Sequence, residues 1–352
     1  MRHLLILLLC APLYGADMTL DRIRAKRDLP GLARARLREG KLSVEVSGVR
    51  RAGEAARVQA DDQWHLGSCT KAMTATLVAL FVERGLLRWD ETLTELFPQL
   101  KLDPAYRKVT LEMLLAHRAG LAGDLLAYDG GKLWARLWDP DLDPRDGRAL
   151  VAKAMLEAPP ASVPGTRFEY SNADYIIAGA VLERLADSSW ETLMRSELFR
   201  PLGMSCGFGP AGGHVREGDR WKPVDRDNPP ALGPAGTVHC SMASWAKFAQ
   251  LHLDGDAGRP TIILHPAAFA KLHSAYPGQE YTYGGWFRVS RPWAGKSGTA
   301  LMHEGSNTMN TALIWLAPER NLALLAATNA AGPEASAAVD EAVGSLIPKD
   351  GD

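Results

Sequence analysis

Three short groups of residues carry side chains that could together perform nucleophilic chemistry. The first is Gly67-Ser-Cys-Thr-Lys71, which stands at the start of a stretch with helical period. Residues three apart in a helix share a face, so Ser68 and Lys71 can meet. A serine hydroxyl is a weak nucleophile until a base takes its proton, and a neutral lysine amine can be that base. Burial and the positive end of the helix must then lower the lysine pKa from about 10.4.

Ser-x-x-Lys is a weak motif by itself, because Ser244-Trp-Ala-Lys247 repeats it. The second copy is interpreted as an N-capping serine, Ser244, ahead of an amphipathic helix. A rival motif, Gly203-Met-Ser-Cys-Gly207, matches the Gly-x-Ser-x-Gly elbow of α/β-hydrolases. That elbow needs a strand before it and a helix after it. A helical run precedes it here, so Ser205 is predicted to be a turn residue.

The second group is Tyr170-Ser-Asn172, in a loop that leads into a helical run. In an extended segment the side chains of Tyr170 and Asn172 point the same way. A tyrosine hydroxyl with a lowered pKa could pass the proton of Ser68 to the leaving group, and the Asn172 amide could bind the substrate's acyl-side amide. Taken alone, the motif would favour a buried structural tyrosine and an asparagine cap.

The third group, His303-Glu-Gly305, heads a predicted strand in which residues 303 and 305 share one face. Gly305 has no side chain, so a substrate could run along the strand edge, where His303 would meet its polar end. The backbone N–H of Ser306 would then join that of Ser68 in stabilising an oxyanion.

The elements that must position these groups follow a simple order. Alternating residues such as 42–49 predict hairpin strands, and helical stretches run from Ser68 to about Leu198. The Gly- and Pro-rich stretch 207–236 is predicted to be a long irregular crossing. Later elements are strand-like runs at 283–289, 303–316 and 322–327, a helix at 241–253 and a closing Ala-rich helix at 334–346.

This order predicts an α+β fold, with an antiparallel sheet flanked by helices and an inserted all-helical lobe. The expected domains are a signal peptide at 1–16, an α/β lobe made of 17–66 plus 230–352, and a helical lobe at 67–229.

The composition favours a globular protein that binds a small ligand. Of the 352 residues, 46% are hydrophobic and 23% charged, which allows a large buried core. A net charge of -1 gives no electrostatic footprint for nucleic acid. We expect a small-molecule or short peptide substrate, no nucleic-acid partner, no transmembrane span, no cofactor and a monomer.

The N-terminus predicts export. A basic head, Met1-Arg-His3, is followed by an apolar run at 4–13 that ends near Ala16. This is typical of a secretory signal peptide, because a membrane span needs about twenty apolar residues. The alternative is an uncleaved N-terminal anchor. We expect an exported protein, periplasmic or secreted.

Cysteines and histidines suggest neither a disulfide framework nor a metal site. Signal removal would take Cys10 and leave Cys69, Cys206 and Cys240, of which one pair could form in an oxidising compartment. The nine histidines show no HExxH and no zinc-ligand spacing, so we predict no metal.

Taken together, these residues resemble the β-lactamase-related serine hydrolases, which include class C β-lactamases, D-Ala-D-Ala carboxypeptidases, D-aminopeptidases and esterases. The resemblance spans nearly the whole mature chain. It rests on Gly48-Val-Arg-Arg51, Leu66-Gly-Ser-Cys-Thr-Lys-Ala-Met73, Phe81-Val-Glu-Arg-Gly-Leu86, Leu114-Leu-Ala-His-Arg-Ala-Gly-Leu121, Pro164-Gly-Thr166, Tyr170-Ser-Asn172, Pro201-Leu-Gly-Met204 and Pro234-Ala-Gly236.

The resemblance also helps to place the third group. Counting back fifteen residues from Pro318-Glu-Arg320, which closes this strand pair in the family, lands on His303. Lys296-Ser-Gly298 looks more like the Lys-Thr-Gly box of a β-lactamase but lies seven residues too early, so it is interpreted as a turn.

The resemblance implies a β-lactamase/transpeptidase-like fold and an acyl-enzyme mechanism. It implies Ser68 as nucleophile, Lys71 as base, Tyr170 as proton relay and Asn172 as a substrate contact. The chain departs from β-lactamases at His303, because they hold the drug's carboxylate with a charged lysine and an unperturbed histidine is mostly neutral at pH 7.

That departure favours the peptidase and esterase branches, while β-lactam, D-amino-acid peptide and ester substrates all stay open. The alternative is a non-catalytic penicillin- or peptide-binding sensor module on the same fold.

Overall fold

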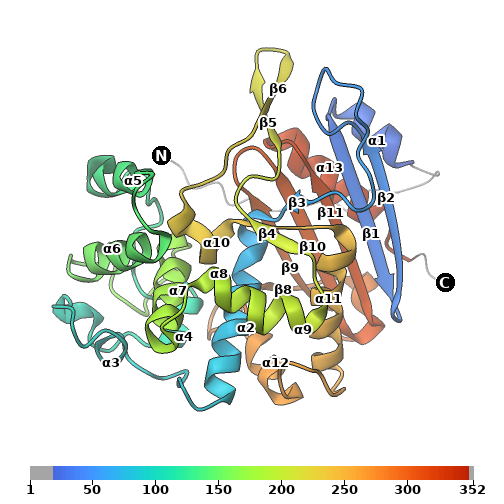
Figure 1. The fold of residues 1–352 in the computed structure, drawn as a ribbon. Helices are drawn as coiled ribbons and strands as arrows, with labels where there is room; N and C mark the ends of the chain where they lie inside the picture. Colours follow the sequence, from blue (N-terminus) through green and yellow to red (C-terminus); the bar gives the residue numbers. More distant parts are fainter. Residues whose placement is uncertain (1–18, 349–352) are drawn as a thin grey trace.

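A six-stranded antiparallel sheet, assembled from both ends of the chain, forms the backbone of the structure (Figure 1). The structure, a computed structural model, describes residues 19–348, so the predicted signal peptide at 1–16, with Cys10, lies outside them. The strand order is β2-β1-β11-β10-β9-β8. The bounds are β1 Gly31–Arg38, β2 Lys41–Gly48, β8 Phe287–Ser290, β9 Thr299–Ser306, β10 Thr311–Ala317 and β11 Leu322–Thr328.

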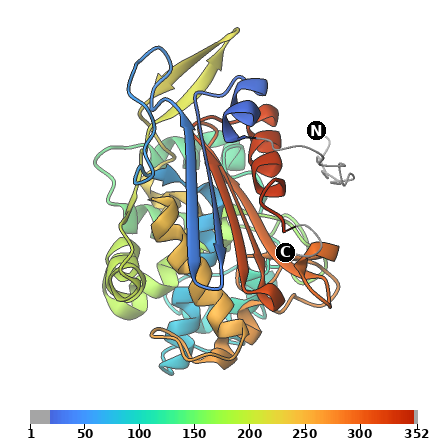
Figure 2. The same ribbon diagram turned by 90° about the vertical axis from the view of Figure 1, so that its right-hand side faces the viewer.

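Helices cover both faces of this sheet (Figure 2). On one face lie α1 (Leu20–Lys26) and α13 (Pro333–Gly344), packed against alternate residues such as Leu313 and Trp315. The neighbouring residues Ala312 and Ile314 face the opposite core, which includes α2 (Thr70–Glu83) and α11 (Met242–Asp256). Because β10 and β11 are buried on both faces, their sequences are continuously apolar and do not alternate with polar residues.

The remaining helices gather mostly beside the sheet, between β2 and β8 in the chain (Figure 1). This arrangement confirms the predicted α+β fold with an antiparallel sheet flanked by helices. The helices are α2 Thr70–Glu83, α3 Leu93–Leu96, α4 Leu111–Leu115, α5 Lys132–Leu137, α6 Pro144–Leu156, α7 Asn172–Ala186, α8 Trp190–Leu193, α9 Arg200–Leu202, α10 Gly233–Gly236, α11 Met242–Asp256 and α12 Pro266–Leu272.

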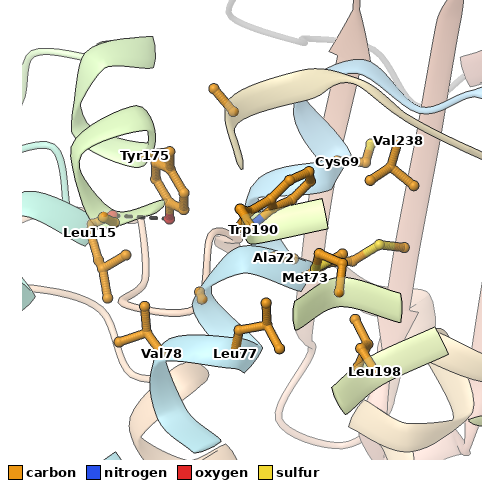
Figure 3. Close-up of a cluster of buried hydrophobic side chains, with 14 of the residues drawn as sticks. Cys69, Ala72, Met73, Leu77, Val78, Leu115, Tyr175, Trp190, Leu198 and Val238 are labelled. Carbon is orange, nitrogen blue, oxygen red and sulfur yellow. Dashed lines mark hydrogen bonds between the residues drawn. The ribbon is translucent and has the colours of Figure 1, made fainter. Parts of the chain in front are cut away.

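Helix α2 runs through the centre of the molecule, between the sheet and the other helices (Figure 1), and Figure 3 shows side chains of this helix in a buried hydrophobic cluster. Every residue from Thr70 to Phe81 is buried, as expected for a helix that is apolar all round. Its buried threonine hydroxyls have hydrogen-bond acceptors: Thr74 donates to Pro234 O at 2.8 Å, and Thr76 donates to Ala72 O at 2.8 Å. The turn that carries Ser68 is therefore anchored to a helix that is buried over most of its length.

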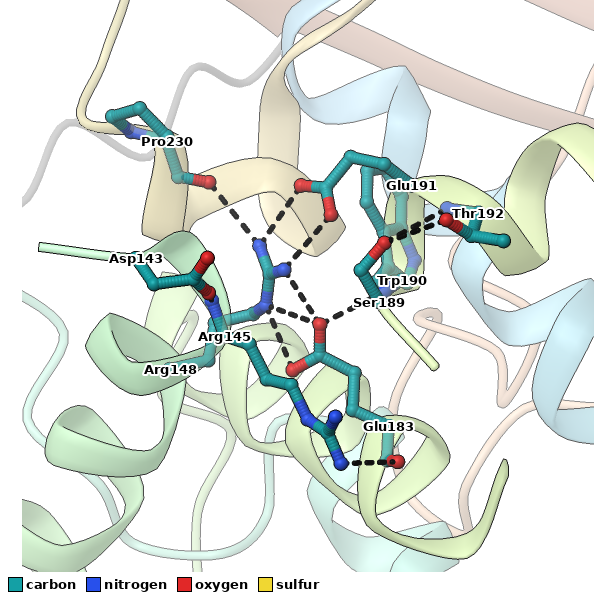
Figure 4. Close-up of polar contacts among 9 residues, drawn as sticks. All are labelled: Asp143, Arg145, Arg148, Glu183, Ser189, Trp190, Glu191, Thr192 and Pro230. Atoms are coloured by element: carbon teal, nitrogen blue, oxygen red, sulfur yellow. Dashed lines mark hydrogen bonds and ion pairs between the residues drawn. The ribbon is translucent and has the colours of Figure 1, made fainter. Parts of the chain in front are cut away.

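A buried ion cluster joins three helices of the helical part (Figure 4). Arg148 of α6 is fully buried and contacts the carboxylates of Glu183 of α7, at 2.6 Å, and Glu191 of α8, at 2.9 Å. Arg148 also donates to Pro230 O at 3.2 Å, and Glu183 accepts from the backbone N–H of Trp190 at 2.8 Å. The charges are thus paired and hydrogen-bonded, as burial requires.

The stretch 207–236 was predicted to be irregular, and this is wrong. It holds a projecting hairpin of β5 (Gly213–Glu217) and β6 (Arg220–Val224), and it begins within β4 (Cys206–Phe208). Its glycines and prolines form the turns between these short elements. A second small sheet joins β4, β7 (Val238–Cys240) and β3 (Trp64–His65).

Two other local predictions also need correction. The strand expected over 283–289 starts only at Phe287, because Gly285 takes a left-handed φ of 79° in the preceding turn. The N-cap of α11 is Ser241, whose hydroxyl accepts from the backbone of Ser244 at 3.2 Å, so Ser244 lies inside the first turn.

The two turn predictions agree with the structure. Ser205 follows a helix and precedes a strand, the reverse of a nucleophile elbow. The segment 296–298 lies in the turn ahead of β9, where Gly298 donates to Gly295 O at 3.1 Å.

Candidate active site

Ser68 and Lys71 meet at the start of α2. Ser68 lies in a 3-10 turn, Gly67–Cys69, and the helix follows at once. The Nζ atom of Lys71 lies 3.0 Å from Ser68 Oγ, 2.7 Å from Asn172 Oδ1 and 2.8 Å from Ala235 O. The Lys71 side chain is fully buried, and this burial lowers its pKa from the ordinary value to about 7. A large fraction of the amine is therefore neutral at physiological pH.

Tyr170 and Asn172 converge on the same amine from α7 and the loop before it. The segment is not extended throughout, since Asn172 is the first residue of α7 and Ser171 is its N-cap. Tyr170 is hydrogen-bonded to Ser68, and its ring centroid lies 4.9 Å from Lys71 Nζ. The expected lowered pKa of Tyr170 is wrong: burial raises the pKa of this hydroxyl, so it carries its proton at neutral pH.

His303 and Gly305 lie on the buried face of β9, as the period of a strand requires, while Glu304 is exposed on the other face. His303 Nδ1 lies 2.7 Å from the carbonyl oxygen of Glu304, and its Nε2 is buried with no partner among the described residues. Burial first, and the nearby Lys71 second, lower the pKa of His303 to about 3. The imidazole is therefore neutral.

The edge of β9 is open beside this histidine. Strand β8 pairs with β9 only from Thr299 to Met302, so residues 303–306 have no strand partner on that side in the described part of the chain. The predicted strand edge therefore exists, although β9 as a whole is an inner strand of the sheet.

Gly305 and Gly67 let β9 approach the Ser68 turn. A Cβ atom on Gly305 would lie 2.1 Å from Leu66 O and 2.6 Å from Ser68 N. A Cβ atom on Gly67, whose φ is 49°, would lie 2.4 Å from Ser306 N. Both glycines are needed for this contact. They bring the backbone nitrogens of Ser68 and Ser306 to facing segments, as two oxyanion donors would require.

A buried polar chain supports this turn from behind, and sequence reasoning missed it. The backbone N–H of Gly67 donates to His65 Nδ1 at 3.1 Å, so the proton of His65 is on Nε2, which lies 2.8 Å from Asp227 Oδ2. Asn307 donates to the other oxygen of Asp227 at 2.9 Å. These hydrogen bonds link residues on both sides of the site. Its members are far apart in sequence and show no joint spacing pattern.

A second buried pair that sequence reasoning missed lies behind Tyr170. His117 Nδ1 and Asp174 Oδ2 are 2.6 Å apart, and the His117 ring centroid lies 4.4 Å from that of Tyr170. The only sequence signal was positional, since His117 lies within a run matched to the family and Asp174 follows Asn172 by two residues.

The cysteines divide into one disulfide and one free thiol among the described residues. Cys206 of β4 is bonded to Cys240 of β7, and Cys69 is buried and free. From Thr19 to Pro348, no group of three or more His, Cys, Asp or Glu side chains is placed to hold a metal ion. Over the same stretch, no helix has the length and apolar character to cross a bilayer.

Comparison with known proteins places this geometry in context. A family model described as Beta-lactamase matches residues 16–347. Penicillin-binding protein 4 of Amycolatopsis lactamdurans is 31% identical over 273 residues, which cover 73% of this chain and 68% of the relative. Esterase EstB of Burkholderia gladioli is 30% identical over 54% of this chain and 50% of its own. The chain thus spans about half the length of some of its curated relatives.

Solved structures share the fold. SurE superposes with a TM-score of 0.77 at 26% identity, covering 95% of this chain and 77% of that one. D-alanine carboxypeptidase AmpC of Burkholderia cenocepacia gives a TM-score of 0.72 at 21% identity, with 92% and 96% covered. An octameric penicillin-binding protein homologue of Pyrococcus abyssi gives a TM-score of 0.75 at 23% identity, with 92% and 75% covered. Our expectation of a monomer stays a prediction.

Proposed function

The chain belongs to the beta-lactamase family, and from this membership we propose that it is a serine hydrolase in which Ser68 forms an acyl-enzyme with an ester or amide substrate. The observation that carries the proposal is the contact of 3.0 Å between Ser68 Oγ and a buried Lys71 amine whose pKa is about 7. Related proteins named as a penicillin-binding protein and as esterases support the same class of chemistry.

The partners of Lys71 suit a neutral amine that acts as base. Asn172 Oδ1 and Ala235 O both accept hydrogen bonds, and a neutral amine has two N–H groups to give them. Its lone pair is then left for the proton of Ser68 Oγ. As that proton moves to Lys71, Oγ forms a bond to the substrate's carbonyl carbon, and the backbone N–H groups of Ser68 and Ser306 bind the oxyanion.

Tyr170 completes the proton transfer in this proposal. Its hydroxyl is protonated and hydrogen-bonded to Ser68, so it can hand its own proton to the leaving group and recover one from Lys71. The bond between the carbonyl carbon and the leaving group breaks at this step, which leaves the acyl-enzyme. Water then repeats the sequence in reverse: it loses a proton to the same groups and releases the acid and Ser68.

His303 narrows the class of substrate. Since the Glu304 carbonyl can only accept, the proton of His303 is on Nδ1 and Nε2 presents a bare lone pair. That lone pair and the neutral ring would repel a carboxylate and favour a hydrogen-bond donor or an apolar group. We therefore propose esters and neutral-ended amides as substrates in preference to β-lactam drugs, whose carboxylate would meet this neutral imidazole.

Covalent labelling tests the nucleophile. A fluorophosphonate probe should add to the wild-type protein once, and peptide mapping should place the adduct on Ser68. The Ser68→Ala variant should stay unlabelled. Absence of labelling in the wild type, or equal labelling of the variant, would contradict the proposal. Reversible binding of a β-lactam or peptide without acylation would instead support a sensor module.

A substrate panel tests the role of His303. A short-chain nitrophenyl ester, a D-alanyl dipeptide and a chromogenic cephalosporin are compared on one sample, with Ser68→Ala as blank. We expect the ester to be cleaved and the cephalosporin to be cleaved slowly or not at all. His303→Lys should raise the ratio of cephalosporin to ester turnover. Fast cephalosporin turnover by the wild type would refute the argument from His303.

We also propose export to the periplasm or beyond. The apolar N-terminal run and the Cys206–Cys240 disulfide support it, because disulfides persist in oxidising compartments. Expression of the full chain in a host with a periplasm should yield a protein processed near Ala16. Quantitative recovery of unprocessed protein in the cytoplasm would contradict this.

A further inference from the structure

His117 occupies a strained backbone position directly beside the proposed machinery. It follows the short helix α4 and takes a φ of 56°, a left-handed conformation that non-glycine residues adopt rarely and at a cost of about 1 to 3 kcal/mol. The side chain is fully buried. The contacts around His117, and not the local backbone preference, therefore determine its conformation.

Those contacts hold the backbone on both sides of Tyr170. The N–H of Glu169 donates to His117 O at 3.0 Å, and the N–H of Ser171 donates to His117 Nδ1 at 3.3 Å. The imidazole packs on the Tyr170 ring at a centroid distance of 4.4 Å. One residue therefore fixes the segment before Tyr170, the segment after it and the plane of its ring.

The Asp174 carboxyl completes the arrangement and carries a proton. A backbone N–H can only donate, so His117 Nδ1, which accepts from Ser171, holds no proton of its own. With Nδ1 accepting, the contact of 2.6 Å to Asp174 Oδ2 is supplied by an acid O–H, and the proton of the neutral imidazole stands on Nε2, which has no partner among the described residues. The other oxygen of Asp174, Oδ1, is also buried without a partner among those residues, which suits a neutral acid better than a carboxylate. Burial raises the pKa of Asp174 and lowers that of His117, in agreement.

Among the described residues, the pair interacts with no cation other than Lys71 that could hold Asp174 ionised. The titratable groups that interact with the pair come from several elements, and Lys71 is the only basic amine among them; Arg118, the next residue in the chain, is engaged by Gln279 and the Tyr276 ring. These groups are Lys71, Tyr106, Tyr170, Tyr175, Tyr281 and His303. An ionised Asp174 raises the pKa of Lys71 and so lowers the fraction of the proposed base that is neutral.

We propose that His117 is a positioning residue for Tyr170, and that its hydrogen bond to a protonated Asp174 keeps a carboxylate away from the Lys71 amine. The pair shapes the reaction without touching the substrate: His117 aligns the hydroxyl that relays the proton, and the neutral acid leaves Lys71 free to act as base. This inference rests on the proposed function of Ser68.

Two substitutions of His117 test the positioning role. His117→Phe keeps a ring but removes Nδ1, and His117→Asn tolerates a left-handed φ but removes the ring. Both should lower kcat for a nitrophenyl ester by at least about 10-fold with KM changed less than about 3-fold, because a misplaced relay slows chemistry more than binding. Circular dichroism establishes that each variant is folded.

His214→Phe is the matched control. His214 is also a buried histidine with two hydrogen bonds, to Asn329 O at 2.6 Å and from Ala52 N at 2.9 Å, but it lies on β5 outside the proposed machinery. It should lower Tm and leave kcat unchanged. If either folded His117 variant kept kcat within about 3-fold of wild type, positioning by His117 would be refuted.

Asp174→Asn tests the protonation state. Infrared difference spectra of wild type minus variant should show the C=O band of a protonated carboxyl group, with no loss of carboxylate bands. The acid limb of the pH profile of kcat/KM should keep its midpoint in the variant, because one neutral donor replaces another. A fall of that midpoint by a full pH unit, or loss of carboxylate bands, would contradict a protonated Asp174 in the wild type.

Labelling separates this inference from the function on which it rests. If the wild type is not labelled at Ser68, the proposed function fails. If the wild type is labelled and the His117 variants react with the probe at the wild-type rate, only the positioning role fails. Slower labelling in both His117 variants, with the His214→Phe control unaffected, supports the proposed function and the positioning role together.

Discussion

Lys71 shows how burial converts an ordinary side chain into a base. An exposed lysine is almost fully charged at neutral pH, whereas Lys71 is buried and gives its hydrogen bonds to the neutral acceptors Asn172 Oδ1 and Ala235 O. Desolvation penalises the charged form, and the pKa of Lys71 falls to about 7. A lysine on the surface would stay charged at neutral pH and could not act as the base.

The pH dependence of hydrolysis follows from this value. The base must be unprotonated to act, so kcat/KM for a nitrophenyl ester should be lost as pH falls through about 7 and should level off above it. Lys71→Arg, which stays charged at all accessible pH, should lower kcat by about 100- to 10,000-fold. A profile that is flat between pH 5 and 9 would contradict Lys71 as the base.

Gly305 is a second residue on which the geometry of the site depends, because one added carbon atom there would disturb the Ser68 turn. A methyl group at this position would collide with Leu66 O and Ser68 N, both backbone atoms that cannot move aside cheaply. Gly305→Ala should therefore lower kcat by at least about 100-fold by displacing the oxyanion donors. Gly53→Ala, whose added Cβ would meet no atom within 4 Å, gauges the effect of a methyl group at a left-handed glycine away from the site.

At the scale of elements, short helices are held in place by a few buried polar contacts. Helix α8 has four residues and cannot be stable alone, yet Glu191 within it and the backbone of Trp190 at its start are tied to α6 and α7 through Arg148 and Glu183 (Figure 4). The Arg148 cluster thus fixes how these helices pack, next to α7, which carries Asn172.

Arg148→Ala should destabilise the fold strongly. Removing the cation leaves two carboxylates without their partner, one of them fully buried, which costs about 3 to 5 kcal/mol. Arg145→Ala on the same helix is the control, because its partner Asp187 is almost fully exposed and such pairs contribute about 0 to 1 kcal/mol. Urea denaturation measures both. Equal losses of stability in the two variants would contradict the structural role of Arg148.

At the scale of the whole molecule, both ends of the chain build one sheet and the middle of the chain supplies the helices beside it. The site lies where these parts meet: Ser68 comes from the 3-10 turn before α2, Lys71 from α2, Asn172 from α7 and His303 from β9. The Cys206–Cys240 disulfide joins β4 to β7. Strand β7 directly follows α10, whose Ala235 carbonyl contacts Lys71, so the disulfide connects β4 to a segment that reaches the site.

Loss of this disulfide should lower stability in a measurable way. The closed loop of 34 residues implies about 2 to 4 kcal/mol of stabilisation. The Cys206→Ala/Cys240→Ala double variant should unfold at lower urea than the oxidised wild type, and a reducing agent should bring the wild type to the same midpoint without affecting the variant. Insensitivity of the wild type to the reducing agent would contradict a formed disulfide.

Much of the fold could be predicted from local patterns. Helical period indicated the helix after Ser68, and a continuous apolar run indicated the strand at 322–327. The predicted run 303–316 divides into the end of β9, a turn and β10. Local patterns failed where short elements are held by distant partners: β5 and β6 lie in a Gly- and Pro-rich stretch, and Ser241, not Ser244, caps α11.

The sequence by itself determined which side chains the candidate site contains: Ser68, Lys71, Tyr170, Asn172 and His303 stand in an order that few folds would share. Only the tertiary structure decided their protonation, because a pKa depends on burial and on neighbours that the chain brings from elsewhere. It lowered the pKa of Lys71, raised that of Tyr170 and left His303 neutral. It also joined His117 to Asp174 across 57 residues, a contact with no local signature.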